Sequence, residues 1–216
     1  MKIKNPIYKT VLILSVISIL ITLYLYPMLP NEIPIHFNIS GEVDDYGPRT
    51  FALFTAVLPL ISLIFFRFLP RLDPKGENYK FHTKAYNVFI LFMMLFFIVL
   101  HWITLFSALG IPVPINKVVP IGMGVLFIIL GNYMPQIRQN YTYGIKLPWT
   151  LSDENNWRAT HRMGGYCYIV SGILFILSSV VTVPFVQVCV AFASIFIFIP
   201  MVYSYIYFKK HQGDTK

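Results

Sequence analysis

The chain has 216 residues, of which 56% are hydrophobic and only 12% are charged, and its formal net charge is +8. About a quarter of the residues in a soluble domain are charged, so this composition excludes an ordinary soluble protein. Apolar runs of about 20 residues recur without the alternation of strands, which argues against an outer-membrane barrel and for membrane-spanning helices.

Six apolar segments, taken in chain order, are long enough to cross a bilayer as helices. They are Thr10–Leu29, Phe51–Leu69, Ala85–Leu109, Val118–Met134, Gly164–Val183 and Phe185–Phe208. We therefore expect an all-α membrane protein with six transmembrane helices. Two modules are expected: residues 1–84 carry the first two helices and an external loop, and residues 85–216 carry the other four helices.

The distribution of Lys and Arg between the loops predicts the orientation. Three bases lie in the N-terminal tail, five around the second-to-third connection, four in the fourth-to-fifth connection and three in the C-terminal tail; only Arg49 and Lys117 of the 17 fall on the other side. Because basic loops stay in the cytoplasm, both termini are expected there. Basic loops are also attracted to anionic lipid, so the positive charge needs no nucleic acid to explain it and no direct nucleic-acid binding is expected.

The external connection, Leu29–Thr50, is called the flap here. Pro30 and Pro34 favour extended backbone, and the alternation of Ile33, Ile35 and Phe37 predicts a short strand. Turn-forming residues follow: Asn38, Ser40, Gly41, Asp44, Asp45 and Gly47. The flap is therefore expected to be a short structured segment over the outer ends of the helices.

The flap contains one histidine, His36, among four carboxylates. A proton-sensing or metal site is conceivable for such a group. One histidine without a second soft ligand is weak support, so no metal and no cofactor are expected.

The fourth-to-fifth connection contains a detailed polar segment, Asn140–Arg162, called the latch here. Gly144 permits a turn, and Thr150 or Ser152 is expected to cap a helix over Leu151–Met163. This helix is expected to lie at the cytoplasmic interface and to turn into the fifth span at Gly164–Gly165.

Two interpretations of the latch side chains stay open. In the first, which composition favours, Trp149 and Trp157 are interfacial anchors, while Lys146, Arg158 and Arg162 reach lipid phosphates or an acidic cytosolic partner. In the second, polar side chains form an enclosed cluster at the inner mouth of the bundle. That set is Asn132, Gln136, Asn140, Thr150, Asn155 and His161.

His101 lies near the middle of the third span, where an ionisable group is a functional candidate. A neutral histidine bonded to a neighbouring helix is the competing and somewhat favoured interpretation. Small residues recur every seven positions in two spans and predict close helix packing. They are Gly124 and Gly131 in the fourth span and Gly164, Ser171 and Ser178 in the fifth.

No enzyme signature is present: H-E-x-x-H, G-x-S-x-G and the phosphate-binding G-x-x-x-x-G-K-[ST] are all missing. The span cores contain no Asp or Glu, which disfavours a membrane enzyme or a proton-coupled pump. A transporter or channel lined by His101, Asn132 and Gln136 remains the alternative to a receptor-like protein.

Two motifs resemble the SdpI family of bacterial multi-pass membrane proteins. The first is Leu29-Pro30, then Ile33-Pro34-Ile35-His36-Phe37-Asn38, Gly41 and Asp44. The second comprises Gly131-Asn132-Tyr133-Met134, Asn140, Gly144 to Leu151, Trp157 and Thr160-His161-Arg162. Where the family usually has Arg and Thr, this chain has Lys146 and Leu147. Lysine keeps the charge without the planar fork of arginine, which disfavours a two-pronged contact there.

The resemblance implies six helices in the bacterial cell membrane and immunity to a secreted membrane-active toxin peptide. It also implies signalling by capture of a cytosolic repressor when toxin is present. The implied peptide-binding residues are His36, Asn38, Gly41 and Asp44. The implied cytoplasmic motif is Asn132, Asn140, Gly144, Lys146, Pro148, Trp149, Thr150, Trp157, His161 and Arg162.

Overall fold

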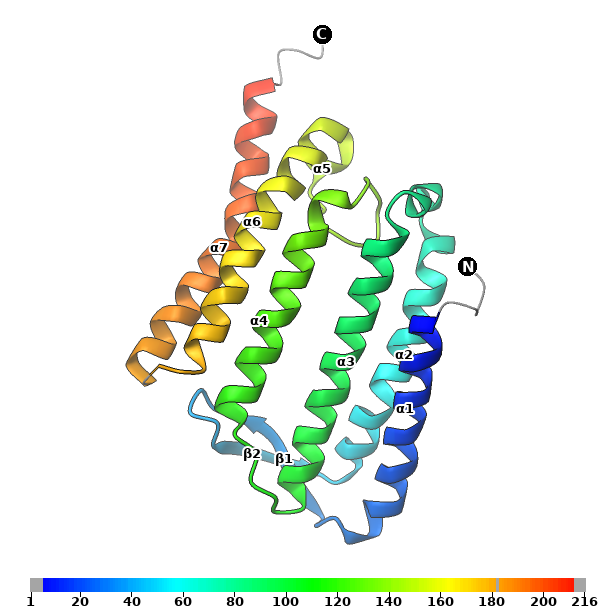
Figure 1. The fold of residues 1–216 in the computed structure, drawn as a ribbon, viewed down its shortest axis with the longest axis vertical. Helices are drawn as coiled ribbons and strands as arrows, with labels where there is room; N and C mark the ends of the chain where they lie inside the picture. Colours follow the sequence, from blue (N-terminus) through cyan, green and yellow to red (C-terminus); the bar gives the residue numbers. More distant parts are fainter. Residues whose placement is uncertain (1–5, 182, 212–216) are drawn as a thin grey trace. The chain divides into compact units, whose positions relative to one another are not determined.

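The computed structural model describes residues 6–181 and 183–211. Three of the terminal bases counted above to predict the orientation lie outside these residues: Lys2, Lys4 and Lys216. The long helices are α1 (Pro6–Leu25), α2 (Thr50–Leu72), α3 (Thr83–Ala108), α4 (Ile115–Tyr133), α6 (Glu154–Ser178) and α7 (Val183–His211) (Figure 1). The short elements are α5 (Pro148–Ser152), strands β1 (Glu32–Phe37) and β2 (Val43–Pro48), and the 3-10 turns Tyr26–Met28, Gly76–Lys80 and Met134–Gln136.

Five of the helices in the described part of the chain are long and apolar enough to cross a membrane. They comprise Pro6–Met28, Thr50–Leu72, Thr83–Ala108, Ile115–Gln136 and Phe185–His211. This confirms a multi-pass membrane protein that is mostly helical.

Helix α6 is not one of these five, because its N-terminal half is polar and carries Glu154, Arg158 and Arg162. Its apolar part, Gly164–Ser178, has 15 residues, which at 1.5 Å per residue is about 22 Å, less than the roughly 30 Å hydrocarbon thickness. The predicted fifth span, Gly164–Val183, and with it the total of six spans, therefore stays a prediction.

The chain divides into two compact units. The first unit comprises Met1–Arg67 and Ile90–Gly122, and the second comprises Phe68–Phe89 and Met123–Lys216.

In the first unit, β1 and β2 form an antiparallel hairpin, with Ile33 opposite Gly47 and Phe37 opposite Val43. The predicted strand is confirmed, but the expectation of turns at Asp44, Asp45 and Gly47 is wrong because these residues form β2. The hairpin packs on the helices through a cluster of buried residues. Its members are Leu29, Ile33, Ala52, Leu105 and Ala108.

In the second unit, glycines bring α4 very close to α6. A Cβ added at Gly131 would lie 2.6 Å from the carbonyl oxygen of Gly165, and one at Gly124 would lie 2.5 Å from that of Gly172. The predicted α4 stripe is therefore a packing seam, but its partners on α6 are displaced by one residue from the predicted Gly164 series.

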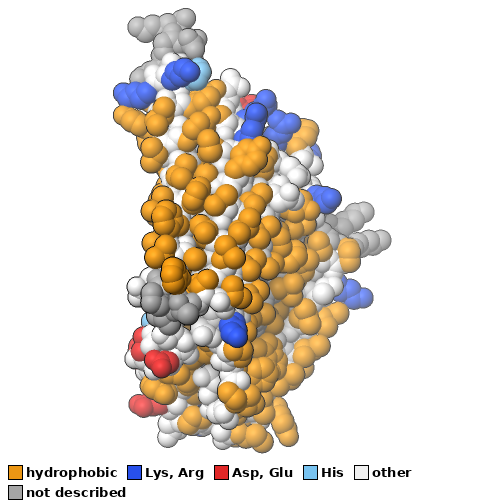
Figure 2. Space-filling model, turned by 60° about the vertical axis from the view of Figure 1, so that its left-hand side comes forward, with side chains coloured by type: hydrophobic (Ala, Val, Ile, Leu, Met, Phe, Trp, Pro, Cys, Tyr) orange, Lys and Arg blue, Asp and Glu red, His pale blue; other side chains and the backbone are white. Residues whose placement is uncertain are grey.

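The predicted α6 stripe contributes to a different contact, since Ser171 Oγ donates a hydrogen bond to the carbonyl of Ala193 on α7, at 2.9 Å. Helices α6 and α7 run side by side in Figure 1. Hydrophobic side chains cover the outer side of these helices in Figure 2, with Lys and Arg near the C-terminal end of α7. Phe192, Ile195 and Phe198 are among the exposed large apolar residues of α7, as expected for a lipid-facing surface.

Candidate functional site

The tip of the flap is a turn held by one side chain. Asn38 Oδ1 accepts hydrogen bonds from the backbone N–H of Ser40 at 2.9 Å and of Glu42 at 3.1 Å. Gly41 has a φ of +84°, which favours glycine, and a Cβ there would lie 2.9 Å from the backbone nitrogen of Asn116. Asn38 and Gly41 therefore shape the turn and dock it on the first turn of α4.

The side chains of His36 on β1 and Asp44 on β2 contact each other across the hairpin of the flap, although the backbone partner of His36 is Asp45. His36 Nδ1 is 2.6 Å from Asp44 Oδ1, and both side chains are largely exposed. The structure thus brings together His36 and Asp44, two of the implied peptide-binding residues, on the open surface of the hairpin.

An apolar cavity of about 260 Å³ lies in the first unit between the flap and the helices. Ile35 and Phe37 line it from β1. Helical residues complete the lining, chiefly Phe51, Phe54, Leu58, Phe97, Leu100 and Ile103. The alternation that predicted β1 therefore places Ile35 and Phe37 over a hollow and His36 on the other face of the strand.

His101, which also borders this cavity, is bonded to two neighbouring helices. Its Nε2 is 2.9 Å from Thr22 Oγ1 on α1, and its Nδ1 is 3.0 Å from Thr55 Oγ1 on α2. The side chain is 1% exposed. Both ring nitrogens are therefore used in helix packing, which favours the structural interpretation of this histidine.

The latch folds around Trp157 and His161. The Trp157 side chain is fully buried and its Nε1 donates to the carbonyl of Ile137 at 2.8 Å, while its ring stacks on His161 with centroids 4.0 Å apart. The prediction that Trp157 is an interfacial anchor is therefore wrong. Its ring N–H has a hydrogen-bond acceptor inside the protein, so burying the ring leaves no donor unpaired.

Gly144 has the two properties that this packing needs. Its φ is +108°, and a Cβ there would lie 2.5 Å from His161 Nε2 and 3.3 Å from the Trp157 ring. The predicted glycine turn is confirmed, and it explains how the backbone of the loop approaches the histidine.

The helix start predicted for the latch is wrong. Thr150 is buried within α5, where its hydroxyl accepts from Leu147 N–H at 2.9 Å and bonds to the Ile145 carbonyl. The N-cap of α6 is instead Asp153, whose carboxylate accepts from Asn155 N–H at 2.8 Å. Pro148 starts the short helix α5, and the Thr150 hydroxyl bonds within α5 and the loop before it, so it cannot cap α6. The expected turn at Gly164–Gly165 is also wrong, since α6 runs through it.

Asn140 organises the loop before α5. Its Oδ1 accepts from the N–H groups of Thr142 and Tyr143, at 3.0 and 2.8 Å, and its Nδ2 donates to the carbonyl of Arg138. The side chain is fully buried. Asn140 is thus a member of the enclosed cluster predicted in the second interpretation, together with Thr150 and His161.

The other predicted members of this cluster are not in it. Asn132, Gln136 and Asn155 are exposed. Lys146 is exposed too, with Nζ 2.8 Å from the carbonyl of Thr142, and Arg162 is exposed on α6.

Three buried polar residues that sequence reasoning missed complete the cluster. Gln139 donates from Nε2 to the backbone carbonyls of Thr150 and Leu151, and its own backbone carbonyl accepts from Asn78 Nδ2 at 2.7 Å. Asp73 accepts from the N–H groups of Lys75 and Tyr141, at 2.8 and 2.9 Å. The Asp73-Pro74 step before a glycine was the available turn signal, while nothing local in the sequence pointed to Gln139.

The third missed residue, Asn156, joins the latch to α7. Its Nδ2 donates to the carbonyl of Ser204 at 3.0 Å, and Trp149 Nε1 donates to Ser204 Oγ at 2.7 Å. Trp149 is half-buried, with its ring against Tyr205 and Phe208. The latch is therefore fixed to the α2–α3 connection, to α6 and to α7 of the second unit.

Comparison with known proteins gives two family matches and one curated relative. Residues 136–204 match the SdpI/YfhL protein family, and residues 13–63 match a domain of unknown function, DUF1648. The immunity protein SdpI of Bacillus subtilis (strain 168) is 27% identical over 205 residues, which cover 94% of this chain and 96% of the relative. No solved structure gives a significant match. The latch and the helices after it thus carry the match to the SdpI/YfhL protein family, and the resemblance of the chain to SdpI extends over nearly its whole length.

Proposed function

We propose that this protein protects the cell that makes it against a secreted, membrane-active toxin peptide. The observation that carries the proposal is the similarity to the immunity protein SdpI, which extends over 94% of the chain. In this proposal the chain crosses the bacterial cell membrane six times, with both termini in the cytoplasm and the flap outside.

The cavity beneath the flap is the proposed place of contact with the peptide. An apolar space of about 260 Å³ suits one large aliphatic or aromatic side chain. The flap around it holds four carboxylates, Glu32, Glu42, Asp44 and Asp45, against the single base Arg49. A peptide that combines apolar side chains with positive charge fits both properties.

The latch is proposed to lie on the cytoplasmic side of the membrane and to pass the signal to the cytosol. Its hydrogen bonds hold one loop, two short helical segments and two long helices together, so a shift of α6 or α7 would also move the loop. A cytosolic repressor that binds this surface when toxin is present is the finer form of the proposal.

The test is expression of the chain in a strain that lacks its own immunity protein, followed by challenge with the secreted killing peptide of the SdpI system. The parent chain is expected to restore growth. Phe37→Ala, which enlarges the cavity, is expected to reduce protection, whereas Tyr46→Ala, an equal truncation on the exposed outer face of the flap, is expected to retain it.

The two polar flap residues need separate variants. Asn38→Ala breaks the turn and so tests the fold of the flap, whereas His36→Ala removes only an exposed hydrogen bond to Asp44. Membrane levels are measured for each variant by quantitative blotting. Absence of protection by the parent chain at normal levels overturns the proposal for this peptide, and full protection by Phe37→Ala removes the cavity from it.

A further inference from the structure

A second hollow lies in the second unit, beside the first turns of α6. Its volume is about 380 Å³. Three arginines line it: Arg138 from the loop after α4, and Arg158 and Arg162 from α6. The last two are four residues apart on a helix, so they project from the same face.

The hollow has more positive than negative charge. Glu154 lies 2.6 Å from Arg158 and 3.8 Å from Arg138. In the described part of the chain, no ion pair involves Arg162. Two of the three guanidinium groups thus share one carboxylate and the third pairs with none among the described residues, which leaves donors for a second anion.

The fold holds Arg138 in place from its backbone. Its N–H donates to His82 Nδ1 at 3.1 Å, and its carbonyl accepts from Asn140 Nδ2 at 2.9 Å. The guanidinium lies over the ring of Phe81, 5.9 Å from the centroid. The backbone of Arg138 is therefore held by His82 and by Asn140 of the buried cluster, and Phe81 lies against its guanidinium.

We propose that this hollow binds a phosphate group. A guanidinium presents donors in a planar fork that matches phosphate oxygens, and several such forks around one space suit a tetrahedral anion with several acceptors. Of the three bases expected from the sequence to reach a phosphate or an acidic partner, Arg158 and Arg162 line the hollow and Lys146 does not. Arg138, which was not among them, is the third base of the lining.

The phosphate has two sources, the headgroup of an anionic lipid and a soluble phosphate. Phe81 and Ile137 add apolar surface to the hollow, and most Lys and Arg residues of the chain are predicted on the cytoplasmic side, where anionic lipid gathers. Both features favour the headgroup. The inference does not depend on a role in immunity.

The experiment uses the full-length protein in neutral detergent and has two arms. Native mass spectrometry measures binding of phosphatidylglycerol against phosphatidylcholine, and thermal melting measures stabilisation by inorganic phosphate. Arg162→Gln and Arg138→Gln are expected to weaken binding of the phosphate source about tenfold each, the usual effect of losing one charge-assisted hydrogen bond. Glu154→Gln, which removes the competing carboxylate, is expected to strengthen it.

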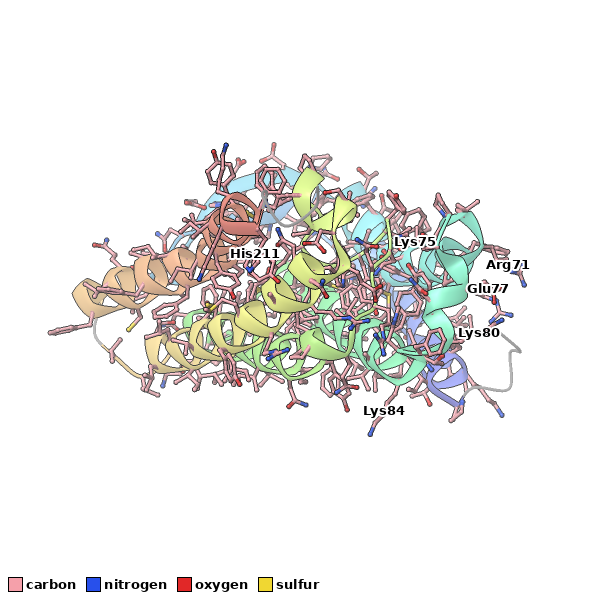
Figure 3. The ribbon with its side chains drawn as sticks, turned by 90° about the horizontal axis from the view of Figure 1, so that it is seen from above. Arg71, Lys75, Glu77, Lys80, Lys84 and His211 are labelled. Atoms are coloured by element: carbon pink, nitrogen blue, oxygen red, sulfur yellow. The ribbon has the colours of Figure 1, made fainter. Side chains whose placement is uncertain are left out.

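Matched controls separate the hollow from the general charge of this surface. Figure 3 shows both control residues. Glu77 lies in the 3-10 turn of the α2–α3 connection, and Lys84 lies in the first turn of α3 and points outward. Lys84→Gln removes one base outside the hollow. Glu77→Gln removes one acid that pairs with Lys80 instead of an arginine of the hollow. Neither control is expected to change binding more than twofold.

Each outcome decides the proposal. Arginine-dependent preference for phosphatidylglycerol supports a lipid headgroup, and arginine-dependent stabilisation by inorganic phosphate without lipid preference supports a soluble phosphate. Equal behaviour of the parent, Arg162→Gln and Arg138→Gln in both arms overturns the site. Stabilisation by a synthetic acidic peptide, dependent on Arg162 and absent with both phosphate sources, also overturns it and makes the hollow a protein-docking surface.

Discussion

Ile145 donates its backbone N–H to Nε2 of His161 at 3.1 Å, across the loop that joins α4 to α5. The other ring nitrogen, Nδ1, lies 2.8 Å from the carbonyl of Trp157 and must be the donor there. The imidazole is therefore neutral, with its proton on Nδ1, and both nitrogens have partners. A single ring thus ties the loop to the first turns of α6.

Replacing His161 with Ala is expected to lower the free energy of unfolding by about 1–3 kcal/mol, because the buried N–H of Ile145 loses its acceptor. A further loss comes from the contact with Trp157. The measurement is thermal melting of the purified protein in detergent.

Arg158→Ala is the control, since it removes only a half-exposed ion pair with Glu154, and such pairs contribute about 0–1 kcal/mol. If His161→Ala melts at the same temperature as the parent and the control, the latch is not a structured part of the fold.

The seam between α4 and α6 gives a second prediction. Gly131→Ala places a methyl group 2.6 Å from the carbonyl oxygen of Gly165, so the helices must separate, at about 1–3 kcal/mol. Gly122→Ala on the same helix is the matched control: its Cβ would meet only the ring of Phe96, at 3.1 Å.

Detergent melting is again the measurement. Gly131→Ala is expected to melt below the parent, and Gly122→Ala within a few degrees of it. The reverse order would show that α4 and α6 are not in backbone contact at Gly131.

The sequence predicts the helices and β1 because each depends on a local period, but it does not predict which side chains the latch encloses. Trp157 illustrates the reason: a tryptophan near a membrane end usually lies at the interface, and only the carbonyl of Ile137, 20 residues away in the chain, makes its burial favourable. Gln139 and Asp73 were missed for the same reason, since their partners come from distant segments. Gly144 was found because a positive φ is a local property.

Because α6 is not among the helices that are long and apolar enough to cross a membrane, the number of membrane crossings needs its own test. If the chain crosses the membrane six times, a cysteine at Ser40 reacts with a membrane-impermeant maleimide in intact cells, and one at Ser152 reacts only after permeabilisation. Both are placed in a chain with Cys167 and Cys189 replaced by Ala. Reaction of both in intact cells would contradict the six-span arrangement.

His82 gives the chain a pH-dependent stability. Burial, together with the charge of Arg138, lowers the pKa of His82 to about 4, with Asp73 acting in the opposite direction. The rings of Tyr79 and Tyr143 pack on it, and the N–H of Arg138 occupies its Nδ1, so the native state requires the neutral ring. Because the unfolded chain takes up the proton near pH 6.5 and the native chain does not, the contribution is complete above pH 6.5 and is lost as the pH falls toward 4. At pH 5 the loss is roughly 1–2 kcal/mol.

His82→Asn isolates this effect, because an asparagine side-chain oxygen can accept from the Arg138 N–H but does not titrate. The parent is expected to melt at a clearly lower temperature at pH 5 than at pH 7.5, and the variant is expected to show a smaller difference. Other groups titrate in the same range, so the comparison rests on the difference between variants and not on the absolute melting temperatures. An unchanged pH dependence in His82→Asn would show that this ring is not held neutral in the folded protein.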